Sequence, residues 1–512
     1  MKLKYITRWL FILAVVLQVS CIKDKSNYQF EAGNPVNITI PGNPVVAVID
    51  EPLTITPNRE FLVAGKTVED YTHEWYLEGK LISKETTLNF NGTKSGTFLL
   101  MYNMIDKATG IRHGLNTGIY IQVISPYETG WDILYEKDGE SEIAHVRATQ
   151  TGYKDQVGLY KEKNNGESLG SKPMRIKDYA VNGGRGLAVI QQGGQGSVEL
   201  DGFTFEKKLV VNESFAGGVP AGLKPVNAGF FESSDVLLNE DGKLYPRLFQ
   251  ANPIAFTVPW LNIPVQTKNP MKITHLWDVW ATNTYYTFMY DELNNRLQYV
   301  LLKGIATITP GNPGGMLQID SVPEPPSYMP PVPGYINPSK PLTGFSYIWG
   351  STFKDVQGFT TMPAFIVKDQ ATSEVYIQTF NFTSILGIQT IHMPGVKQVF
   401  TGKNHLTAAS KFVAIKSRSF LFFSGDADNK GLYYYDVALG GATKLYNQLP
   451  ASVTALRQSD DGEQLAVGLA DGTVIFYDIS NQAMNNGDPV ELHRLSGLGR
   501  VADITVRGGY QL

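Results

Sequence analysis

Two segments near the C-terminal end of the chain repeat the same hairpin pattern, and this repeat constrains the fold more than any other feature. In each, an apolar run is followed by a polar turn and a second run that closes on a Tyr-Asp pair; the segments are residues 422–437 and 466–479. The two pairs end at Asp436 and Asp478, which are 42 residues apart. A period of this length is typical of one four-stranded blade of a β-propeller.

Similar hairpin tips occur upstream at wider but comparable intervals. Taken as markers, the tips are Asp138, Gly194, Asp241, Asp291, Asp369, Asp428 and Asp471, and the steps between them are 56, 47, 50, 78, 59 and 43 residues. The step of 78 contains a segment, residues 310–341, with ten prolines in 32 residues, and without it 46 remain. The spacing predicts a seven-bladed β-propeller over residues 126–512 with a proline-rich insertion at 304–343, and six or eight blades remain open alternatives.

A propeller must close into a ring to protect its strand edges. Residues 501–506 form a late β-rich run with no following partner in the sequence. We therefore expect this run to complete the blade that residues 131–135 begin.

The first 125 residues predict a separate β-sandwich over residues 36–125. Candidate strands are residues 36–40, 45–49, 73–77, 97–102 and 118–123. The segment 71–77 alternates in polarity, which places Tyr71, His73, Trp75 and Leu77 on one face. Trp75 is the candidate core residue between two sheets, as in immunoglobulin-like domains. With 50 glycines, 28 prolines and no long segment of helical periodicity, the fold class predicted for the whole chain is all-β.

The N-terminal residues have the pattern of an export signal. Three basic residues, Lys2, Lys4 and Arg8, precede the apolar run 9–19, which is too short to span a bilayer because a spanning helix needs roughly 20 residues. Cys21, the only cysteine in the chain, follows directly. We expect residues 1–20 to be a signal peptide, Cys21 to carry lipid that holds the protein to a membrane, and residues 21–35 to form a tether. A lone cysteine also excludes an intramolecular disulfide.

Charge and motif content exclude several functions. The net charge is −4, and no basic cluster occurs, which argues against nucleic acid as a partner. The seven histidines show no metal-ligand spacing, and no nucleophile-elbow motif is present. Residues 426–431 are similar to the start of a calcium loop but lack the downstream glutamate, so we interpret them as a hairpin turn. We therefore predict no catalytic residue, metal site or cofactor.

Aromatic residues provide the only candidate ligand site. They are concentrated in the middle of the chain, and amphipathic rings bind the faces of sugars in many extracellular sites. The candidates are Trp260, Trp277, Trp280, Tyr328, Tyr335 and Trp349. For the tryptophans the alternative is packing in the blade cores. Tyr328 and Tyr335 lie in the proline-rich insertion, and long loops on rigid scaffolds often carry function.

Three motifs together support a family resemblance. Residues 17–21 (LQVSC) resemble the lipobox of bacterial lipoproteins, with Gln18 departing from the usual aliphatic residue, and the strand 95–98 running on to an Asp-containing turn at 106–110 resembles a PKD-like (polycystic-kidney-disease-type) module. With the degenerate propeller, this order resembles the PKD-like-family lipoproteins of Bacteroidota.

The resemblance implies a setting as well as a fold. It implies a lipid anchor in the outer membrane, at the cell surface or on the periplasmic face, and an outer-membrane transporter complex of the SusC/SusD kind as partner. The implied function is non-enzymatic capture of a glycan, a peptide or another polymer for uptake. Two alternatives remain open: a propeller-based glycan hydrolase or lyase, and a structural or adhesion module that binds other proteins.

Overall fold

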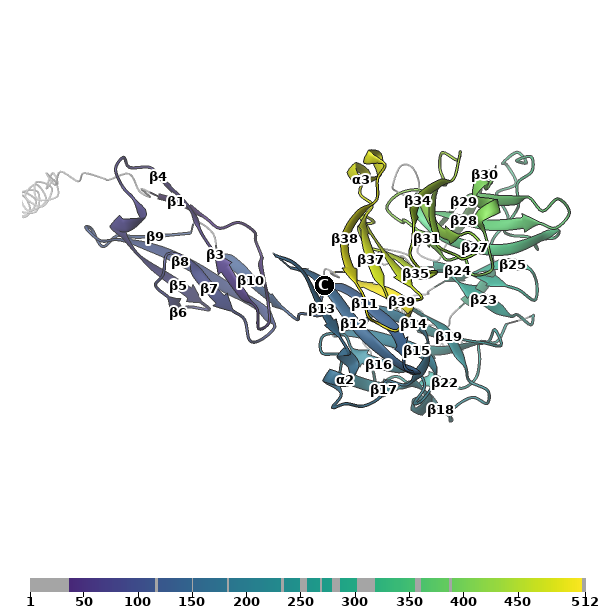
Figure 1. Ribbon diagram of the computed structural model, residues 1–512, viewed down its shortest axis with the longest axis horizontal. Coiled ribbons are helices and arrows are strands. Elements are labelled where there is room, and N and C mark those ends of the chain that lie inside the picture. The colour runs from purple at the N-terminus through teal and green to yellow at the C-terminus, as the bar shows by residue number, and fades with distance from the viewer. Residues whose placement is uncertain are drawn as a thin grey trace, which may run out of the picture. The chain divides into compact units, whose positions relative to one another are not determined.

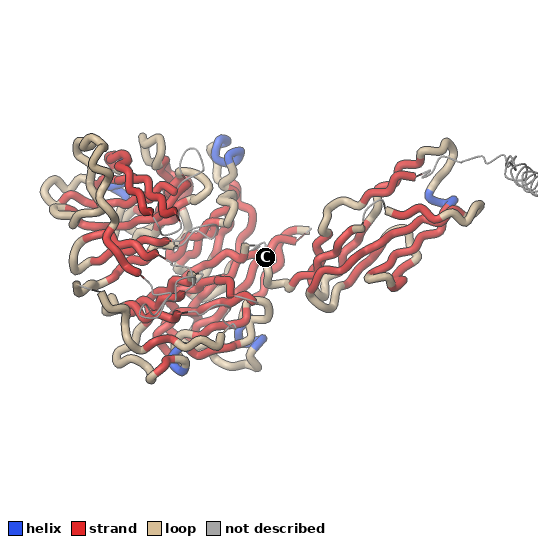
Figure 2. Tube along the Cα trace, turned by 180° about the vertical axis from the view of Figure 1, so that it is seen from behind, coloured by secondary structure: helices blue, strands red, loops and turns tan. Residues whose placement is uncertain are grey.

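The chain folds into two compact units, residues Met1–Ser125 and Pro126–Leu512. The computed structural model describes residues 36–115, 118–149, 151–181, 184–231, 234–248, 256–267, 269–278, 286–301, 318–354, 361–385 and 389–508. Strands dominate both units, with only short helical segments, as Figure 2 shows, so the predicted all-β class is confirmed. The residues predicted as signal peptide (1–20), lipid site (Cys21) and tether (21–35) lie outside the described residues, as do Trp280 and residues 304–317 of the predicted insertion.

Unit 1 contains one large sheet and two short strand pairs (Figure 1). The large sheet has the order β2-β10-β8-β5-β6, with β9 paired to β8. Its strands are β2 (Val45–Val48), β10 (Ile119–Ile124), β8 (Gly96–Asp106), β5 (Tyr71–Leu77), β6 (Lys80–Ser83) and β9 (Arg112–Gly114). The pairs are β1 (Val36–Thr39) with β4 (Asn58–Phe61) and β3 (Pro52–Ile55) with β7 (Leu88–Asn91). Each of the five expected strands coincides with one of these within a few residues, whereas β3, β4, β6, β7 and β9 were not expected.

The core of unit 1 surrounds Trp75. Its side chain has no exposed surface, and its Nε1 donates to the backbone oxygen of Glu85 over 2.9 Å. Tyr71 and His73 are buried on the same face of β5, as the alternation predicted. The apolar residues of the large sheet and of both short pairs belong to one cluster around this ring. The prediction of Trp75 as the core residue is confirmed.

The described residues of unit 2 form seven successive antiparallel sheets, numbered I to VII, of which six have four described strands and sheet III has three. Sheet I is β39 (Arg500–Arg507), β11 (Gly130–Lys137), β12 (Glu140–Thr149) and β13 (Gly152–Val157). Sheet II is β14 (Ser171–Val181), β15 (Gly184–Gly193), β16 (Val198–Asp201) and β17 (Lys207–Val210), and sheet III is β19 (Pro225–Phe230), β20 (Ser234–Asn239) and β21 (Leu244–Leu248). Sheet IV is β23 (Ile273–Leu276), β24 (Tyr286–Asp291), β25 (Arg296–Leu301) and β26 (Gln318–Ser321).

The last three sheets continue the same pattern. Sheet V is β27 (Phe345–Lys354), β28 (Thr361–Asp369), β29 (Val375–Ile385) and β30 (Gln389–Val399). Sheet VI is β31 (Phe412–Ala414), β32 (Phe420–Gly425), β33 (Gly431–Asp436) and β34 (Lys444–Gln448), and sheet VII is β35 (Val453–Gln458), β36 (Gln464–Leu469), β37 (Val474–Asp478) and β38 (Val490–Leu495). A parallel pair, β18 (Phe215–Ala216) with β22 (Trp260–Leu261), and two helices, α2 (Leu159–Lys163) and α3 (Asn481–Asn486), lie in the connections.

Five of the seven hairpin-tip markers lie in turns between the second and third strands of their sheets. The other two, Asp291 and Asp369, are the last residues of the second strands of sheets IV and V, directly before such turns. Asp138 and Gly139 show why these residue types occur there. Their φ angles are 54° and 81°, a region that glycine adopts without strain and that aspartate tolerates better than most residues. The prediction that these positions are hairpin tips is confirmed.

Neighbouring sheets are held together by separate apolar cores. Seven clusters of buried residues each join two successive sheets, and the last of them joins sheet VII to sheet I. In that last core, the rings of Trp131 and Phe476 lie 5.5 Å apart. Each sheet therefore buries both of its faces against neighbours.

The first sheet is completed by the last strand of the chain. Strand β39 pairs antiparallel with β11, with Trp131 opposite Val506 and Tyr135 opposite Val501. In Figure 1 the yellow β39 lies beside the blue β11. The expected pairing of residues 501–506 with residues 131–135 is confirmed.

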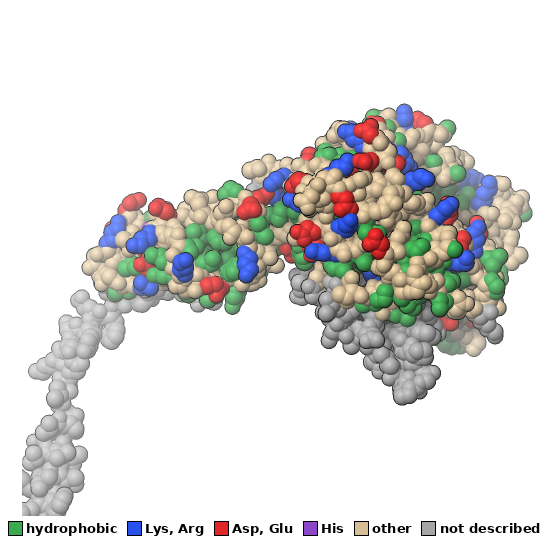
Figure 3. Space-filling model, turned by 90° about the horizontal axis from the view of Figure 1, so that it is seen from below, with side chains coloured by type: hydrophobic (Ala, Val, Ile, Leu, Met, Phe, Trp, Pro, Cys, Tyr) green, Lys and Arg blue, Asp and Glu red, His purple; other side chains and the backbone are tan. Residues whose placement is uncertain are grey.

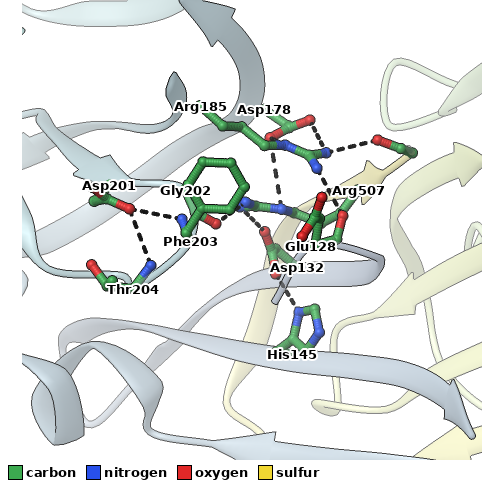
Figure 4. Close-up of polar contacts among 11 residues, drawn as sticks. Glu128, Asp132, His145, Asp178, Arg185, Asp201, Gly202, Phe203, Thr204 and Arg507 are labelled. Atoms are coloured by element: carbon green, nitrogen blue, oxygen red, sulfur yellow. Dashed lines mark hydrogen bonds and ion pairs between the residues drawn. The ribbon is translucent and has the colours of Figure 1, made fainter. Parts of the chain in front are cut away.

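Buried ion pairs reinforce this closure. Arg507 donates to the carboxylate of Asp132 over 3.0 Å and also to the backbone oxygen of Gly202, and Asp132 in turn contacts Nδ1 of His145 over 2.7 Å (Figure 4). None of the side chains of Arg507, Asp132 and His145 is exposed. Because Gly202 follows the third strand of sheet II, the network joins sheet I to sheet II.

The described part of the proline-rich insertion packs against sheets IV and V. Ile336 and Leu342 are buried in the core that these sheets share. The hydroxyl of Tyr335 lies 2.6 Å from Nε2 of His392, and Nδ1 of His392 donates to the backbone oxygen of Pro323 over 2.7 Å. The segment from Pro323 onward is therefore fastened to the sheet rather than projecting from it. Among the described residues no helix is long and apolar enough to cross a membrane.

Candidate functional site

The first strands of successive sheets in unit 2 contact one another, so side chains from sheets far apart in the sequence meet in one region. Contacts join β39 to β14, β14 to β19, β19 to β23, β27 to β31, β31 to β35 and β35 to β39. Each first strand is an edge strand, which pairs with only the second strand of its own sheet. Polar residues on these strands are therefore brought together where the sheets converge.

Asp278, which follows β23 of sheet IV, is the meeting point of three cations. Its Oδ1 lies 2.6 Å from Nζ of Lys177, and its Oδ2 lies 3.0 Å from Nη1 of Arg457. Nζ of Lys416 donates to the backbone oxygen of Asp278 over 3.4 Å. Lys177 is on β14 of sheet II, Arg457 is on β35 of sheet VII, and Lys416 follows β31 of sheet VI. We call these four residues the central charge cluster.

Local structure positions these side chains. Ile176, adjacent to Lys177, is buried in the core between sheets I and II, and its amide donates to Asp503 over 3.0 Å. The amide of Lys416 donates to Oε1 of Gln458 on β35 over 2.8 Å, which ties the turn after β31 to sheet VII. The backbone beside both lysines is therefore held by neighbouring sheets.

The central charge cluster remains accessible. Side-chain exposure is 43% for Asp278, 27% for Arg457 and 17% for Lys177. A small solute or a projecting group of a larger ligand can therefore reach the charged atoms.

The electrostatics of the cluster follow from its three cations. Desolvation by the surrounding protein favours the neutral acid, but Lys177, Arg457 and Lys416 outweigh it and lower the pKa of Asp278 below its ordinary value. Desolvation lowers the pKa of Lys416 to about 8; Asp278 opposes this decrease, and Arg457 and Lys177 add to it. Burial likewise raises the pKa of the nearby Asp460. The positive charge is therefore only partly compensated.

A second group of charged residues lies on or directly beside the first strands of sheets I, II and VI, and one of its members, Arg175, is two positions before Lys177 on β14. Burial lowers the pKa of Lys411, and Arg175 and Arg500 lower it further, while Asp503 opposes them. Arg175 is on β14, and Arg500 and Asp503 are on β39. Across both groups the described residues named here include six cations and three carboxylates. On the face of unit 2 seen in Figure 3, by contrast, acidic and basic side chains are interspersed.

Two of the predicted aromatic ligand residues, Trp260 and Trp277, belong to the cores between sheets. Trp260 is 1% exposed, its Nε1 donates to Glu199 over 3.3 Å, and Arg247 lies 4.5 Å from its ring centre. Trp277 is 3% exposed and donates to the hydroxyl of Tyr347 over 2.8 Å. Neither ring has a free face for a ligand, so for these two residues the packing alternative holds and the binding prediction is corrected.

The other candidates lie apart from one another. Trp349 is half-buried and stacks on Phe412 with ring centres 5.5 Å apart, and Tyr335 is half-buried against sheets IV and V. Tyr328 is 78% exposed. Among the described residues no ring contact joins any two of the predicted aromatic candidates. Ligand binding at Tyr328, Tyr335 and Trp349 stays a prediction, and Trp280 lies outside the described residues.

The sequence contains one signal for the central charge cluster. Lys177 and Arg457 are charged residues inside first strands, where the adjacent residues Ile176 and Gln458 are buried. Charges at corresponding places in several sheets indicate a polar centre, but this correspondence is visible only once the strand order is known.

Residues 426–431 form the hairpin turn between β32 and β33, as interpreted from the sequence. Asp426 contacts Nδ1 of His405 over 2.8 Å and accepts from the hydroxyl of Tyr433 over 2.8 Å. Within the described part of the chain, no group of three His, Cys, Asp or Glu side chains could hold a metal ion.

Comparison with solved structures finds similar chains at low sequence identity. A quinonprotein alcohol dehydrogenase-like protein from Bacteroides thetaiotaomicron has 14% identity and a TM-score of 0.42, and the match covers 91% of this chain and 97% of that one. A candidate 6-phosphogluconolactonase from Bacteroides fragilis has 9% identity and a TM-score of 0.39, with 86% of this chain and 99% of that chain covered.

Comparison with protein families gives a match in the N-terminal part of the chain. No curated protein matches the sequence. The model of the PKD-like family matches residues 21–173, which include every described strand of unit 1. The chain therefore carries a PKD-like domain at its N-terminal end.

Proposed function

We propose that the chain is a non-enzymatic binding lipoprotein of the outer membrane that captures a glycan, a peptide or another polymer. In this proposal a SusC/SusD-like uptake system receives the captured ligand. Lipid on Cys21 holds the protein at the membrane, the PKD-like domain serves as a spacer, and unit 2 is a seven-bladed β-propeller that presents the binding site.

The arrangement of cores supports a propeller. Seven sheets are joined in sequence by seven apolar cores, the last joining sheet VII to sheet I. The last strand of the chain completes the first sheet. Propellers use this kind of closure to remove exposed sheet edges.

The observation that carries the binding function is the central charge cluster. Asp278, Lys177, Lys416 and Arg457 come from four different sheets, and three of them are joined through side-chain ion pairs although Asp278 and Arg457 are 179 residues apart. Such a partly exposed group of charges, held on rigid strands, is suited to bind a polar ligand. Nothing in this role requires a chemical step.

A binding screen tests the proposal. The mature full-length chain in detergent is applied to an array of polysaccharides and peptides, and we expect retention of at least one polymer. Loss of that retention in Arg457→Ala would place the ligand at the central charge cluster. Failure to retain any polymer, together with co-purification of a membrane partner, would instead support the adhesion alternative.

The anchor is tested separately. We expect Cys21→Ser to move the protein from the membrane fraction to the soluble fraction of the cell envelope, because no acyl chain can then be attached. Protease added to intact cells distinguishes the two faces of the outer membrane, since only a surface-exposed chain is cleaved. Unchanged membrane retention of Cys21→Ser would contradict lipidation at this residue.

A further inference from the structure

We infer that the central charge cluster binds the acid groups of an acidic glycan, its carboxylates or sulfates, in competition with Asp278. This inference rests on the proposed binding function and specifies the ligand class for the same site.

Three cations converge on one carboxylate. Lys177 and Arg457 contact the two different oxygens of Asp278, and Lys416 contacts its backbone oxygen. Lys177 and Arg457 can donate further hydrogen bonds, since an ammonium group has three N–H bonds and a guanidinium group has five. A carboxylate or sulfate placed between them would form charge-assisted hydrogen bonds of the strong type.

Arg457 shows this spare capacity directly. Its Nη1 lies 3.0 Å from Oδ2 of Asp278, and its side chain is 27% exposed. An acid oxygen of a ligand can therefore approach the guanidinium group and form a charge-assisted hydrogen bond. Asp278 and the acid group of the ligand would then share one guanidinium group.

The surplus of positive charge extends along the first strands. Arg175 is two positions before Lys177 on β14, and Arg500 is on β39. Both lie close enough to Lys411 to lower its pKa. Two successive groups of cations suit a polymer with acid groups at regular intervals better than a single anion. A glycan carries such groups on rigid rings, which lose little conformational freedom on binding, whereas an acidic peptide must order a flexible backbone.

Asp278 distinguishes this inference from a purely structural ion-pair cluster. If Asp278 only neutralises its neighbours, replacing it removes a stabilising contact. If it competes with a ligand acid, replacing it frees Lys177 and Arg457 and tightens binding. The first role therefore predicts a less stable variant without tighter glycan binding, and the second predicts a variant that binds the glycan more tightly.

The experiment measures binding by calorimetry with the mature full-length chain in detergent at pH 6.5, below the pKa of about 8 of Lys416. The probes are oligogalacturonate, chondroitin sulfate oligosaccharide, neutral dextran, poly-glutamate and inorganic sulfate. For the two acidic glycans we expect about tenfold weaker binding in Arg457→Gln and in Lys416→Gln, and tighter binding in Asp278→Asn. Lys243→Gln, a lysine in an exposed ion pair on a hairpin turn, is the matched control and should bind as the unaltered chain does.

Each outcome decides the inference. Equal binding of the acidic glycans by Arg457→Gln, Lys416→Gln and Lys243→Gln would overturn it, as would a preference for poly-glutamate over both glycans. Dextran binding that is unaffected by all variants would overturn the acid-group inference while supporting the proposed capture function. Binding of inorganic sulfate that Arg457→Gln weakens, with no polymer bound, would support an anion site but contradict polymer capture. Circular dichroism of each variant confirms that it is folded.

Discussion

Arg507 donates a hydrogen bond from Nη1 to Oδ2 of Asp132 over 3.0 Å, although the two residues are 375 positions apart. Neither side chain is exposed to solvent. Burial alone would raise the pKa of Asp132, but Arg507 and His145 reverse this effect and lower the pKa below its ordinary value. The carboxylate is therefore charged inside the protein only because the last strand brings its partner to it.

Replacing Arg507 by leucine should destabilise unit 2 strongly. The change leaves the Asp132 carboxylate buried without its cation, which costs about 3–5 kcal/mol. Urea denaturation at pH 7 measures the loss. The control is Arg494→Leu, whose partner Glu491 is on the surface and whose loss should cost less than about 1 kcal/mol. Equal stability of the two variants would show that the buried pair contributes little.

Deleting residues 501–512 should destabilise all of unit 2 rather than sheet I alone. The deletion removes most of β39, exposes the edge of β11 and opens the core between sheets VII and I. We expect a large fall in the melting temperature of unit 2, measured by calorimetry. Deletion of residues 509–512 leaves β39 intact and is the control. Unchanged melting after the longer deletion would contradict closure through β39.

Asp235 should make unit 2 less stable as pH rises. Burial raises its pKa to about 7; Arg247 opposes this increase, and Glu199 adds to it. Because the folded state holds the proton more tightly than the unfolded chain, the free energy of unfolding should fall between about pH 4 and pH 7 and then level off. The change is on the order of 4 kcal/mol for a pKa that rises from 3.8 to about 7. Asp235→Asn should flatten this dependence in urea titrations at pH 5, 6, 7 and 8.

The control for this titration is Glu162→Gln, since Glu162 is exposed and pairs with the adjacent Lys163. This variant should keep the slope of the unaltered chain. A slope that persists in Asp235→Asn would assign the pH dependence to another group.

The proline-rich segment should detach more readily in acid. Burial lowers the pKa of His392, although the backbone oxygen of Pro323 opposes this decrease. Stability from this neutral imidazole is present above about pH 6.5 and is lost as pH falls through the lowered pKa. Hydrogen exchange at the amides of Ile336 and Leu342, which bond to Gln378 and Asn295, should therefore be faster at pH 5 than at pH 8 after correction for intrinsic rates.

A pair of Tyr→Phe variants isolates the contact with His392. Tyr335→Phe removes the hydroxyl that lies 2.6 Å from His392 and should cost about 1 kcal/mol, seen as faster exchange in the same segment. Tyr328→Phe removes a hydroxyl from a ring that is 78% exposed and should change nothing. Equal exchange in the two variants would show that the hydroxyl of Tyr335 does not hold the segment.

Trp75→Ala should unfold or loosen unit 1. The ring has no exposed surface, lies 4.3 Å from the ring of Tyr102, and its removal should cost about 3–5 kcal/mol. Hydrogen exchange in β5 and β8 reports the change. Tyr120→Ala, at a half-exposed position on β10, should cost less than about 0.5 kcal/mol. Slow exchange retained in Trp75→Ala would contradict its role as the central core residue.

The positions of strands and turns could be predicted because their causes are local. Alternation along 71–77 places Trp75 inside, and tips such as Asp138-Gly139 adopt positive φ angles. The ligand residues could not be predicted in the same way. Trp260 and Trp277 have the same local sequence character whether a ring packs between two sheets or faces a ligand, and only their neighbours in space decide between these outcomes.

The sequence by itself determined that the chain is all-β, where its hairpin tips lie, that residues 501–506 pair with residues 131–135, and that Trp75 is a core residue. Only the tertiary structure decided which charges meet. Lys177 and Asp278 are separated by 101 residues and Asp278 and Arg457 by 179, and their contacts depend on seven sheets converging in one region. Periodicity and turn chemistry act over a few residues, whereas this convergence arises from the packing of every sheet against the next.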